Sequence, residues 1–506
     1  MNLTEQKPLL ELVTQAMDMQ KRGRLQESFA IYAHILSQYN YYAGGWFLSG
    51  LVLRDLGDLE GATMRLSRAI ALEADHGEWH LELGHILKLR GKTLAALDRF
   101  QEAIRLAGDH AQAHFFLGDT YVDLGQVDNA IPCFERAVGL QPDLDVAWNN
   151  LGLCFKVKQQ FDRALDCFDR AIQLNGEQAS YHVNKALALL TVGRMEEGFL
   201  EYEWRLAMEP VQVVWPVVLP RWQGEAISGQ RVLVTSEQGF GDNLQFIRYL
   251  PVLRERFGAV VYFSCLAGVV PLLQGHPEWE PVLEQGVCQG MAADRFRAMF
   301  DVQIPLMSLP GVLYKTLSNK SGQLEPLPIG VPYLRGDPLL CREWQERLEG
   351  EGLKVGLVWE GKPLHRHDPM RRRSCSLTDL RRLALVSGCR FFSLQKGKGS
   401  VLEQEMAWLT DLSSYLTDFS CTAAIVENLD LVITIDTSVA HLAGALGRPV
   451  WTLLPVSADW RWFLESEASP WYPTMRLFRK SGLESWSDVV ERLAQALEQK
   501  VDRNSL

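Results

Sequence analysis

The sequence predicts two architectures in one chain: an α-helical superhelix built from repeats, followed by an α/β region with two doubly wound parallel sheets. Three observations support this prediction. Glycines recur at a spacing of 34 residues through the first 206 positions. Short apolar runs alternate with amphipathic stretches from residue 231 onward. Between these regions, three prolines interrupt the helical pattern over residues 207–230.

The repeat register is set by three columns of residues. The turn glycines are Gly23, Gly57, Gly91, Gly125 and Gly193, and Gln159 occupies the position of the missing glycine. The small-residue column is Gly50, Gly84, Gly118 and Gly152, and the column that fills the space beside it is Leu66, Phe100, Phe134, Phe168 and Tyr202. A helix–turn–helix unit with this period is typical of tetratricopeptide repeats. We therefore predict about six repeats over residues 1–206.

Such arrays present a groove, and two residues are candidates for binding in it. Asn150 and Asn184 occupy equivalent positions in successive repeats. Their amides could bind the backbone of an extended peptide through paired hydrogen bonds. The alternative is that asparagine is simply a common residue at this position. We expect the array to bind a protein partner, with Asn150 and Asn184 as candidate acceptor-binding residues.

The composition excludes several classes of partner. A net charge of −11 and a pI near 5.6 argue against general binding to nucleic acid or to an anionic membrane. We expect no membrane span, because no apolar run reaches the roughly 18 residues that a transmembrane helix needs. The nine cysteines lie singly without zinc-site spacing, which favours reduced thiols. The sequence therefore predicts a cytoplasmic protein.

The α/β region contains a series of strand-like runs with helix-like stretches between them. The predicted strands are 231–236, 259–265, 353–359, 390–395, 430–436 and 450–455, and the predicted helices include 242–257, 266–275 and 377–387. Ligands of such sheets bind at the carboxyl ends of the strands. The cleft between the two sheets is therefore the expected site.

A ligand could bind at two polar segments, each of which directly follows a predicted strand. The first contains Gly239, Gly241 and Asp242; its glycines permit close approach of a ligand, and Asp242 either faces the cleft or caps the next helix. The second runs from Trp359 to Ser374, includes Lys362 and Arg373, and is the densest cationic stretch of the chain. It is either a solvated loop or a diphosphate clamp, and its place between a strand end and a helix favours the clamp.

Two further segments follow later strands. Gln395 and Lys396 begin a glycine-rich turn, which is either a simple turn or part of the site. The predicted strand at 430–436 ends at Asp436 and is followed directly by an apolar helix. The polar residues at this junction and in the first turns of the helix are Asp436, Thr437, Ser438 and His441. Free N–H groups and hydroxyls at a helix N-terminus suit a phosphate, whereas Asp436 could instead only cap that helix.

Several sequence motifs, in the order in which they occur along the chain, resemble the bacterial heptosyltransferase family of glycosyltransferases (family 9). The resemblance is to the subgroup of this family that has tetratricopeptide repeats. These motifs are PRWQGE, EQGFGDNLQFIRYLP, VGLVWEGKP, FFSLQKG, DLVITIDTSVAHLAGALGRPVWTLLP and DWRWF, and the resemblance covers about residues 195–480. It implies a GT-B fold of two Rossmann-like domains, at 231–338 and 339–506, after a repeat array at 1–206 and a connector at 207–230. The subgroup usually has Ala and Asn at the positions of Glu360 and Lys362.

The resemblance also implies an activity: inverting, metal-independent transfer of a hexosyl, heptosyl or other glycosyl group from a nucleotide sugar, with no cofactor. It implies that Asp242 is the general base and that the donor contacts include Arg373, Asp436, Thr437 and Ser438. The repeats favour a protein acceptor, for which flagellin or another surface protein is a hypothesis. The alternatives are a lipopolysaccharide or glycan acceptor, and a non-catalytic interaction protein with a degenerate GT-B region.

Overall fold

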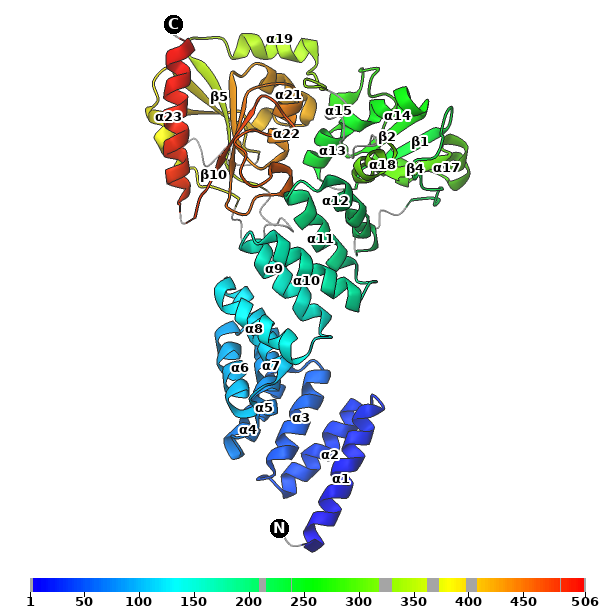
Figure 1. The fold of residues 1–506 in the computed structure, drawn as a ribbon, viewed down its shortest axis with the longest axis vertical. Helices are drawn as coiled ribbons and strands as arrows, with labels where there is room; N and C mark the ends of the chain where they lie inside the picture. The colour runs from blue at the N-terminus through cyan, green and yellow to red at the C-terminus, as the bar shows by residue number, and fades with distance from the viewer. Residues whose placement is uncertain are drawn as a thin grey trace. The chain divides into compact units, whose positions relative to one another are not determined.

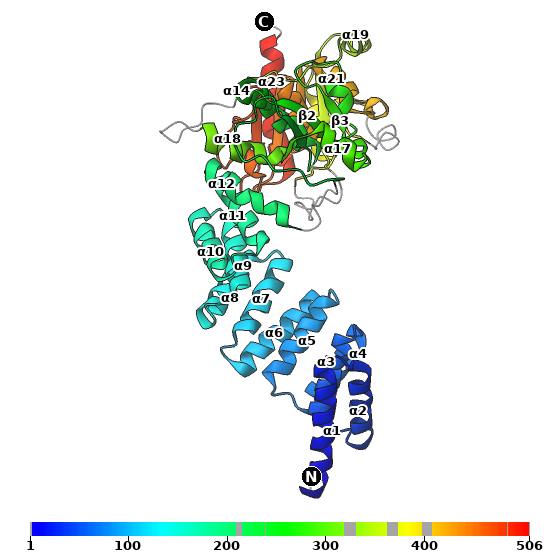
Figure 2. The same ribbon diagram turned by 90° about the vertical axis from the view of Figure 1, so that its right-hand side faces the viewer.

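The computed structural model describes residues 3–208, 215–237, 239–317, 330–361, 373–396, 407–482 and 484–504 (Figures 1 and 2). The chain forms two compact units, Met1–Lys185 and Ala186–Leu506, called here the repeat unit and the α/β unit. The division falls inside the sixth predicted repeat. The last helices of the predicted array therefore belong to the same compact unit as the sheets.

Paired helices make up the repeat region. They are α1 (Leu3–Lys21), α2 (Leu25–Gln38), α3 (Ala43–Asp55), α4 (Leu59–Leu72), α5 (Gly77–Leu89), α6 (Thr93–Ala107), α7 (Ala111–Asp123), α8 (Val127–Leu140), α9 (Asp145–Val157), α10 (Phe161–Leu174), α11 (Ala179–Thr191) and α12 (Met195–Tyr202). From α1 to α10, consecutive helices pack on one another in chain order, as Figure 1 shows. The prediction of tandem helical repeats is confirmed.

The turn positions of the repeats share one backbone conformation. The five predicted turn glycines have φ between 72° and 85°. This left-handed region costs other residues free energy because their Cβ crowds the following carbonyl group. Gln159, in the position of the missing glycine, nevertheless has φ of 58°. The fold thus imposes the turn even where the sequence does not supply glycine.

The small-residue column lies directly against the aromatic column. A Cβ added to Gly84, Gly118 or Gly152 would come within 2.6, 3.0 or 2.7 Å of the Phe100, Phe134 or Phe168 ring, respectively. These phenylalanines are fully buried. The glycine on the first helix of each pair has no side chain, and this leaves room for the phenylalanine ring of the second helix.

Within its described residues, the α/β unit has two sheets whose strands all pair in parallel. The four-stranded sheet has the order β3 (Val282–Glu284), β2 (Val260–Cys265), β1 (Arg231–Thr235), β4 (Val302–Pro305). The six-stranded sheet has the order β10 (Met475–Arg479), β9 (Val450–Leu454), β8 (Leu431–Ile435), β5 (Leu353–Val358), β6 (Cys389–Ser393), β7 (Leu409–Asp411). The prediction of an α/β architecture with parallel sheets is confirmed.

Helices connect and cover these strands. In the first sheet's region they are α13 (Phe240–Phe246), η2 (Ile247–Tyr249), α14 (Leu250–Phe257), α15 (Val270–Leu273), α16 (Gln285–Gln289), α17 (Ala293–Met299), η3 (Leu306–Ser308) and α18 (Leu309–Leu317). In the second they are α19 (Pro338–Arg347), η4 (Asp379–Leu385), η5 (Ser413–Tyr415), α21 (Phe419–Glu427), α22 (Ser438–Ala445), η6 (Trp460–Trp462) and α23 (Trp486–Asn504). The large core of the second region includes β5, β8 and the inner face of α23.

Two of the predicted helices have a different form. Residues 379–385 form the 3₁₀ helix η4, although the apolar spacing over 377–387 predicts an α-helix. The predicted helix at 266–275 is reduced to the four residues of α15. Pro271 and the left-handed Gly275 fix this short turn, because proline fits only the first turn of a helix and glycine ends it.

The last helix of the repeat region packs within the α/β unit. Phe199 on α12 lies edge-to-face with Trp460 at a centroid distance of 5.6 Å, and its Cβ lies against Gly311 on α18. Beside it, in η1 (Glu203–Ala207), Arg205 donates hydrogen bonds of 2.7 and 3.0 Å to the Glu237 carboxylate at the end of β1. Both side chains are 5% exposed. This buried ion pair joins the last repeat helix to the first candidate loop.

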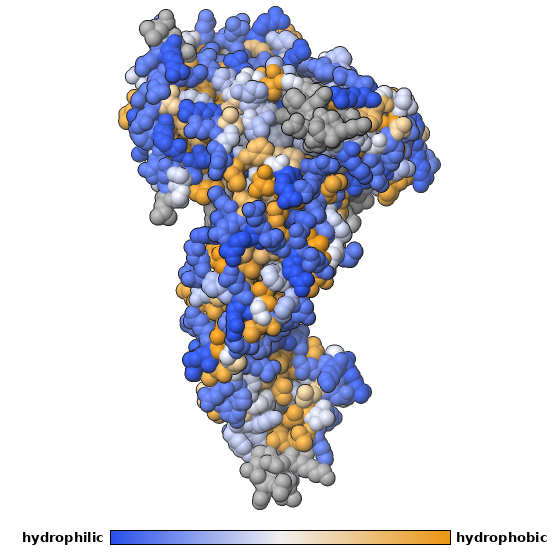
Figure 3. Space-filling model, in the orientation of Figure 1, coloured by the Kyte–Doolittle hydropathy of each residue, from blue (hydrophilic) through white to orange (hydrophobic). Residues whose placement is uncertain are grey.

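Polar residues cover most of the face of the molecule in Figure 3, with apolar residues in smaller groups among them. Large apolar side chains that are more than half exposed include Met64, Leu89 and Leu94 in the repeat unit. Within the parts of the chain that the structure describes, we find no helix with both the length and the apolar character required to cross a bilayer.

Candidate functional site

The loop after β1 holds the Asp242 carboxylate in a defined orientation. Gly239 is the N-cap residue that precedes α13, and its backbone N–H donates to Asp242 Oδ2 at 2.9 Å. Asp242 Oδ1 accepts a hydrogen bond from Arg461 Nη2 at 2.5 Å. The side chain remains 19% exposed. Asp242 therefore makes the capping contact that the sequence allowed and also faces a charged cluster.

Arg461 lies in η6, after β9, and was not predicted as a site residue. Besides Asp242, its guanidinium donates to Asp459 Oδ1 at 2.8 Å and to Gln245 Oε1 at 2.7 Å. Asp459 caps η6 by accepting from the Arg461 backbone N–H. The segment DWRWF follows a predicted strand end, so the rule that located the other four segments could also have located Arg461 and Asp459.

The loop after β8 lies against the loop after β1. Thr437 is the residue that precedes α22, and Ser438 begins this helix. Thr437 Oγ1 lies 3.0 Å from Thr434 Oγ1 and makes no capping hydrogen bond to α22. A Cβ on Gly241 would come within 2.9 Å of His441 Cδ2 and 3.8 Å of Ser438 Cα. Glycine at 241 thus permits close contact between the two predicted loops.

His441 is a buried neutral residue in this contact. Its Nδ1 lies 3.0 Å from the Tyr472 hydroxyl, and its ring stacks on Trp462 at a centroid distance of 5.3 Å. Burial, reinforced by the charge of Arg461, lowers the pKa of His441 to about 3. The imidazole is therefore uncharged at neutral pH and supports the loop by packing.

The carboxylates of the cluster differ in the direction in which their pKa values are shifted. Burial raises the pKa of Asp242, whereas Arg461 lowers it. Burial and the neighbouring Asp459 raise the pKa of Asp436 to about 6, against the opposing effect of Arg373. Burial also disfavours the charged form of Asp459, but Arg461 outweighs it and the pKa of Asp459 is lowered. Such divergent pKa values in one cleft are a feature of functional sites.

The predicted residues of the second sheet's other loops have different environments. Arg373 is partly buried beside Gly361 and lies close enough to influence Asp436. Trp359 is buried in the core. The Gln395 amide is bonded to the backbone of residues 359 and 360 at 3.0 to 3.3 Å, so it ties two strand-end loops together. Lys396 is exposed, with Nζ 3.4 Å from the Thr417 carbonyl oxygen.

Lys362 and the remaining cationic residues at 363–372 lie outside the described residues. Of the two cationic donor-binding candidates in the predicted diphosphate clamp, Lys362 and Arg373, the structure therefore describes Arg373. No group of three or more His, Cys, Asp or Glu side chains in the described ranges is arranged to hold a metal ion. All nine cysteines lie in those ranges, and each is unpaired.

The asparagines predicted in the repeat groove form part of a polar ladder. Asn184 Nδ2 donates to Asn149 Oδ1 at 2.9 Å, and Asn149 Nδ2 donates to Asn150 Oδ1 at 3.2 Å. Asn150 Nδ2 in turn lies 3.5 Å from Asp119 Oδ1. The ladder connects helices α7, α9 and α11, which are the first helices of three successive repeats. Asn150 and Asn184 are both partly exposed.

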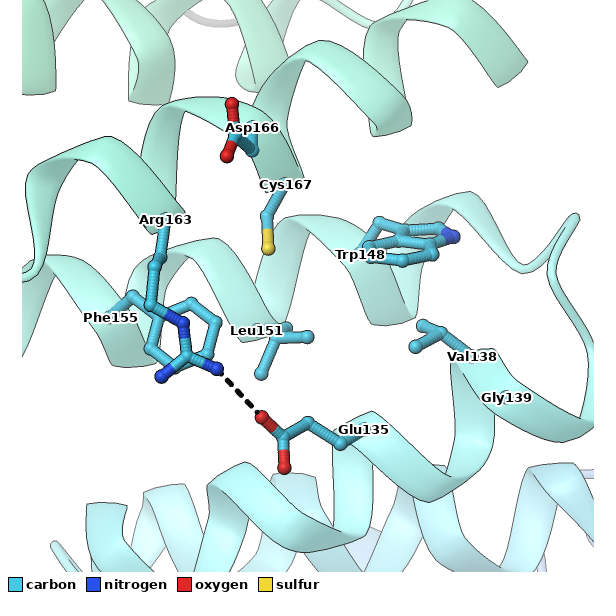
Figure 4. Close-up of a pocket in the computed structure, with 9 residues that line it drawn as sticks. All are labelled: Glu135, Val138, Gly139, Trp148, Leu151, Phe155, Arg163, Asp166 and Cys167. Carbon is cyan, nitrogen blue, oxygen red and sulfur yellow. Dashed lines mark hydrogen bonds and ion pairs between the residues drawn. The ribbon is translucent and has the colours of Figure 1, made fainter.

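A pocket of about 320 Å³ lies elsewhere in the repeat unit, between α8, α9 and α10 (Figure 4). Trp148, Leu151 and Phe155 form its wall on α9. Arg163 closes one side, where it pairs with Glu135 at 3.0 Å and covers the Phe155 ring at 3.8 Å. Gly139 also lines the pocket, and its counterparts one repeat away are Arg105 and Gln173. The ladder residues do not line this pocket.

Comparison with known proteins identifies the repeats. Residues 146–178 match one tetratricopeptide repeat family, and residues 89–145 and 117–156 match a second one. The chain therefore contains tetratricopeptide repeats. It is also 29% identical over 332 residues to protein FlbA of Caulobacter vibrioides (strain ATCC 19089 / CIP 103742 / CB 15), a match that covers 62% of this chain. The chain spans about half, 54%, of the length of FlbA.

Similar solved structures match about a third of the chain. MamA is 24% identical, with a TM-score of 0.31, and the match covers 33% of this chain and 97% of MamA. YrrB, a TPR protein with an unusual peptide-binding site, is 20% identical with a TM-score of 0.33, over 35% of this chain and 92% of YrrB. The pilF protein of Pseudomonas aeruginosa is 16% identical with a TM-score of 0.34, over 40% of this chain and 98% of pilF.

Proposed function

We propose that the chain is an inverting glycosyltransferase that moves a sugar from a nucleotide-sugar donor to a protein acceptor. The observation that carries this proposal is the contact between two strand-end loops, one with Asp242 and one with the N-terminus of α22. A carboxylate thereby lies beside a helix N-terminus that can bind an anion. Both groups follow the carboxyl ends of parallel strands, which is where ligands of such sheets bind.

The proposed reaction is a single displacement. The acceptor oxygen attacks the anomeric carbon, the bond from that carbon to the diphosphate oxygen breaks, and Asp242 accepts the acceptor's proton. A carboxylate with a modest pKa suffices, because the acceptor oxygen becomes acidic as its new bond forms.

The departing diphosphate requires positive charge and hydrogen-bond donors. Arg373 supplies the charge, and the free N–H groups of α22 with the hydroxyls of Thr437 and Ser438 supply donors. Lys396 and Lys362 are further candidates for the same anion. Trp359 and Gln395 would act by holding the loop that carries them, because both are buried.

The repeat unit is proposed to bind the acceptor. Repeat arrays bind extended segments of other proteins along their grooves. The ladder offers partly exposed amides at a constant spacing, which suits a peptide backbone. Flagellin is one acceptor to test, alongside lipopolysaccharide as the alternative acceptor class.

A panel assay tests the proposal. The full chain is incubated with UDP-, GDP-, ADP-, CMP- and dTDP-linked sugars, and both hydrolysis and transfer are measured. We expect turnover of at least one donor, and a loss of about 10²- to 10⁴-fold in the Asp242→Asn variant. The Asp294→Asn variant is the control, because that carboxylate is fully exposed on α17 and should leave the rate unchanged.

Two results would contradict the proposal. Undiminished transfer by Asp242→Asn would remove Asp242 as the base. No turnover or binding of any donor would favour a non-catalytic interaction protein whose α/β unit has lost the activity.

A further inference from the structure

The side chain of Arg461 is fixed by contacts with several elements. Its three nitrogens donate to Asp242 on α13, to Asp459 before η6, and to Gln245 on α13. The guanidinium carbon lies 4.4 Å from the centre of the Trp460 ring. Only 9% of the side chain is exposed. Arg461 therefore has little freedom to move with respect to Asp242.

Both carboxylate oxygens of Asp242 are engaged by fixed donors. Oδ1 accepts from Arg461, and Oδ2 accepts from the Gly239 backbone N–H. Each oxygen retains a second lone pair. The plane of the carboxylate is thus set by two donors from different segments of the chain, while its exposed part can still accept a proton.

The charges of Asp242, Asp459 and Arg461 sum to zero when one of the two carboxyl groups is protonated. With Asp242 ionised, two carboxylates face the single charge of Arg461. When Asp242 accepts a proton, Asp459 alone remains to neutralise Arg461. A buried cation without a counterion would be costly. Asp459 therefore makes protonation of Asp242 electrostatically acceptable.

We propose that Arg461 is the positioning residue for Asp242, and that Asp459 holds Arg461 in charge balance while Asp242 accepts and releases a proton. This inference rests on the proposed function for its catalytic meaning. The effect of Arg461 and Asp459 on the pKa of Asp242 can be measured without a substrate.

Other charged groups lie near Asp242. Glu237, at the end of β1, raises the pKa of Asp242 but is paired with Arg205. Asp436, at the end of β8, is influenced by Arg373, and His441 on α22 is held neutral. After burial, the largest influences on the pKa of Asp242 are Arg461, which lowers it, and Asp459, which raises it. Substitutions of these two residues must therefore shift it in opposite directions.

A titration of Asp242 in the full chain tests the inference. Protein labelled with ¹³C at the aspartate carboxyls is titrated by NMR, and the Asp242→Asn variant identifies the Asp242 resonance. We expect Arg461→Met to raise the pKa of Asp242 by at least about one unit, as loss of a neighbouring arginine does. Asp459→Asn should lower it, and Arg461→Lys should leave it nearer to the wild-type value than Arg461→Met does.

An unchanged Asp242 titration in the Arg461 variants would overturn the inference. Thermal unfolding of each variant is the folding control. If Arg461→Met does not fold, the opposite shifts expected for Arg461→Lys and Asp459→Asn decide the question.

The pH dependence of transfer supplies the second readout. Because Asp242 must be ionised to accept a proton, the rate falls as the pH drops below its pKa. The acid limb should therefore move to higher pH in Arg461→Lys and to lower pH in Asp459→Asn, and a loss of rate at an unchanged limb would contradict the positioning role. Absence of transfer by the wild type would end the proposed function, while the NMR titration would still decide the effect of Arg461.

Discussion

The repeat unit and the α/β unit are stabilised by contacts of different kinds. In the repeat unit, Gly152 meets Phe168, 16 positions later, and equivalent pairs recur in the neighbouring repeats. In the α/β unit, Asp242 meets Arg461, which is 219 positions away, and this contact occurs once. Periodicity therefore predicts the first kind of contact, whereas the second depends on how two sheets come together.

This difference has a functional side. A repeated contact can be varied in one repeat while its neighbours keep the architecture, so the exposed residues of the array are free to select a partner. Within the described residues, the charged cluster has no second copy. Each of its members acts on the others, and changes there should affect chemistry more than folding.

The largest of these effects is expected in the repeat unit, where it tests the contact between the glycine and phenylalanine columns. Gly152→Ala should lower the free energy of unfolding by about 1–3 kcal/mol, because its Cβ would come within 2.7 Å of the buried Phe168 ring. Gly139→Ala is the matched control: nothing lies within 4 Å of its added Cβ, and alanine favours the helix by up to about 1 kcal/mol. Urea unfolding followed by circular dichroism measures both. Equal effects of the two changes would refute the packing role of the glycine column.

A smaller effect is expected for the polar ladder. In the Asn150→Ala/Asn184→Ala variant, the ratio of transfer to a protein acceptor over donor hydrolysis should fall about 30-fold, since each of the two lost hydrogen bonds is worth about 1 kcal/mol. Mass spectrometry of the acceptor measures the ratio. Asn129→Ala on α8 is the control, because its amide donates to Gln126 in the preceding turn and is not a member of the ladder. A ratio that the double variant leaves unchanged would separate the ladder from acceptor binding.

The smallest effect concerns the one turn without glycine. Gln159→Gly should raise the free energy of unfolding by less than about 1 kcal/mol, because it relieves a left-handed backbone but increases the freedom of the unfolded chain. The midpoint of urea unfolding provides the measurement. A decrease in stability would mean that the Gln159 side chain contributes more than its backbone strain costs.

Sequence predicted most of the fold because its signals are local. The 34-residue register located the turn at Gln159 despite the missing glycine, and the strands at 231–235, 353–358 and 431–435 were recognisable as apolar runs. The short strand β3 and the 3₁₀ form of η4 were not predicted. Both depend on packing against neighbouring elements, which a local pattern does not contain.

The site was predicted in part for the same reason. The strand-end rule found Asp242 and Ser438, and the structure brings their loops into contact through Gly241. Arg461 and Asp459 were missed because the loop after β9 has no glycine-rich or cationic cluster to mark it. Their position after a strand could have marked them as candidates, but the contacts of Arg461 with Asp242 and Gln245 join segments more than 200 positions apart and are not encoded in a local pattern.

The most direct test of the proposed donor site is calorimetric titration of the full chain with UDP, GDP, ADP and dTDP. At least one should bind, and Arg373→Ala should weaken that binding about tenfold or more, because a charge-assisted hydrogen bond to phosphate is worth about 1.5–3 kcal/mol. Arg476→Ala, which changes an exposed arginine paired with Glu467, should bind like the wild type. Failure of all four to bind, or equal binding by wild type and Arg373→Ala, would contradict a diphosphate site at these loops.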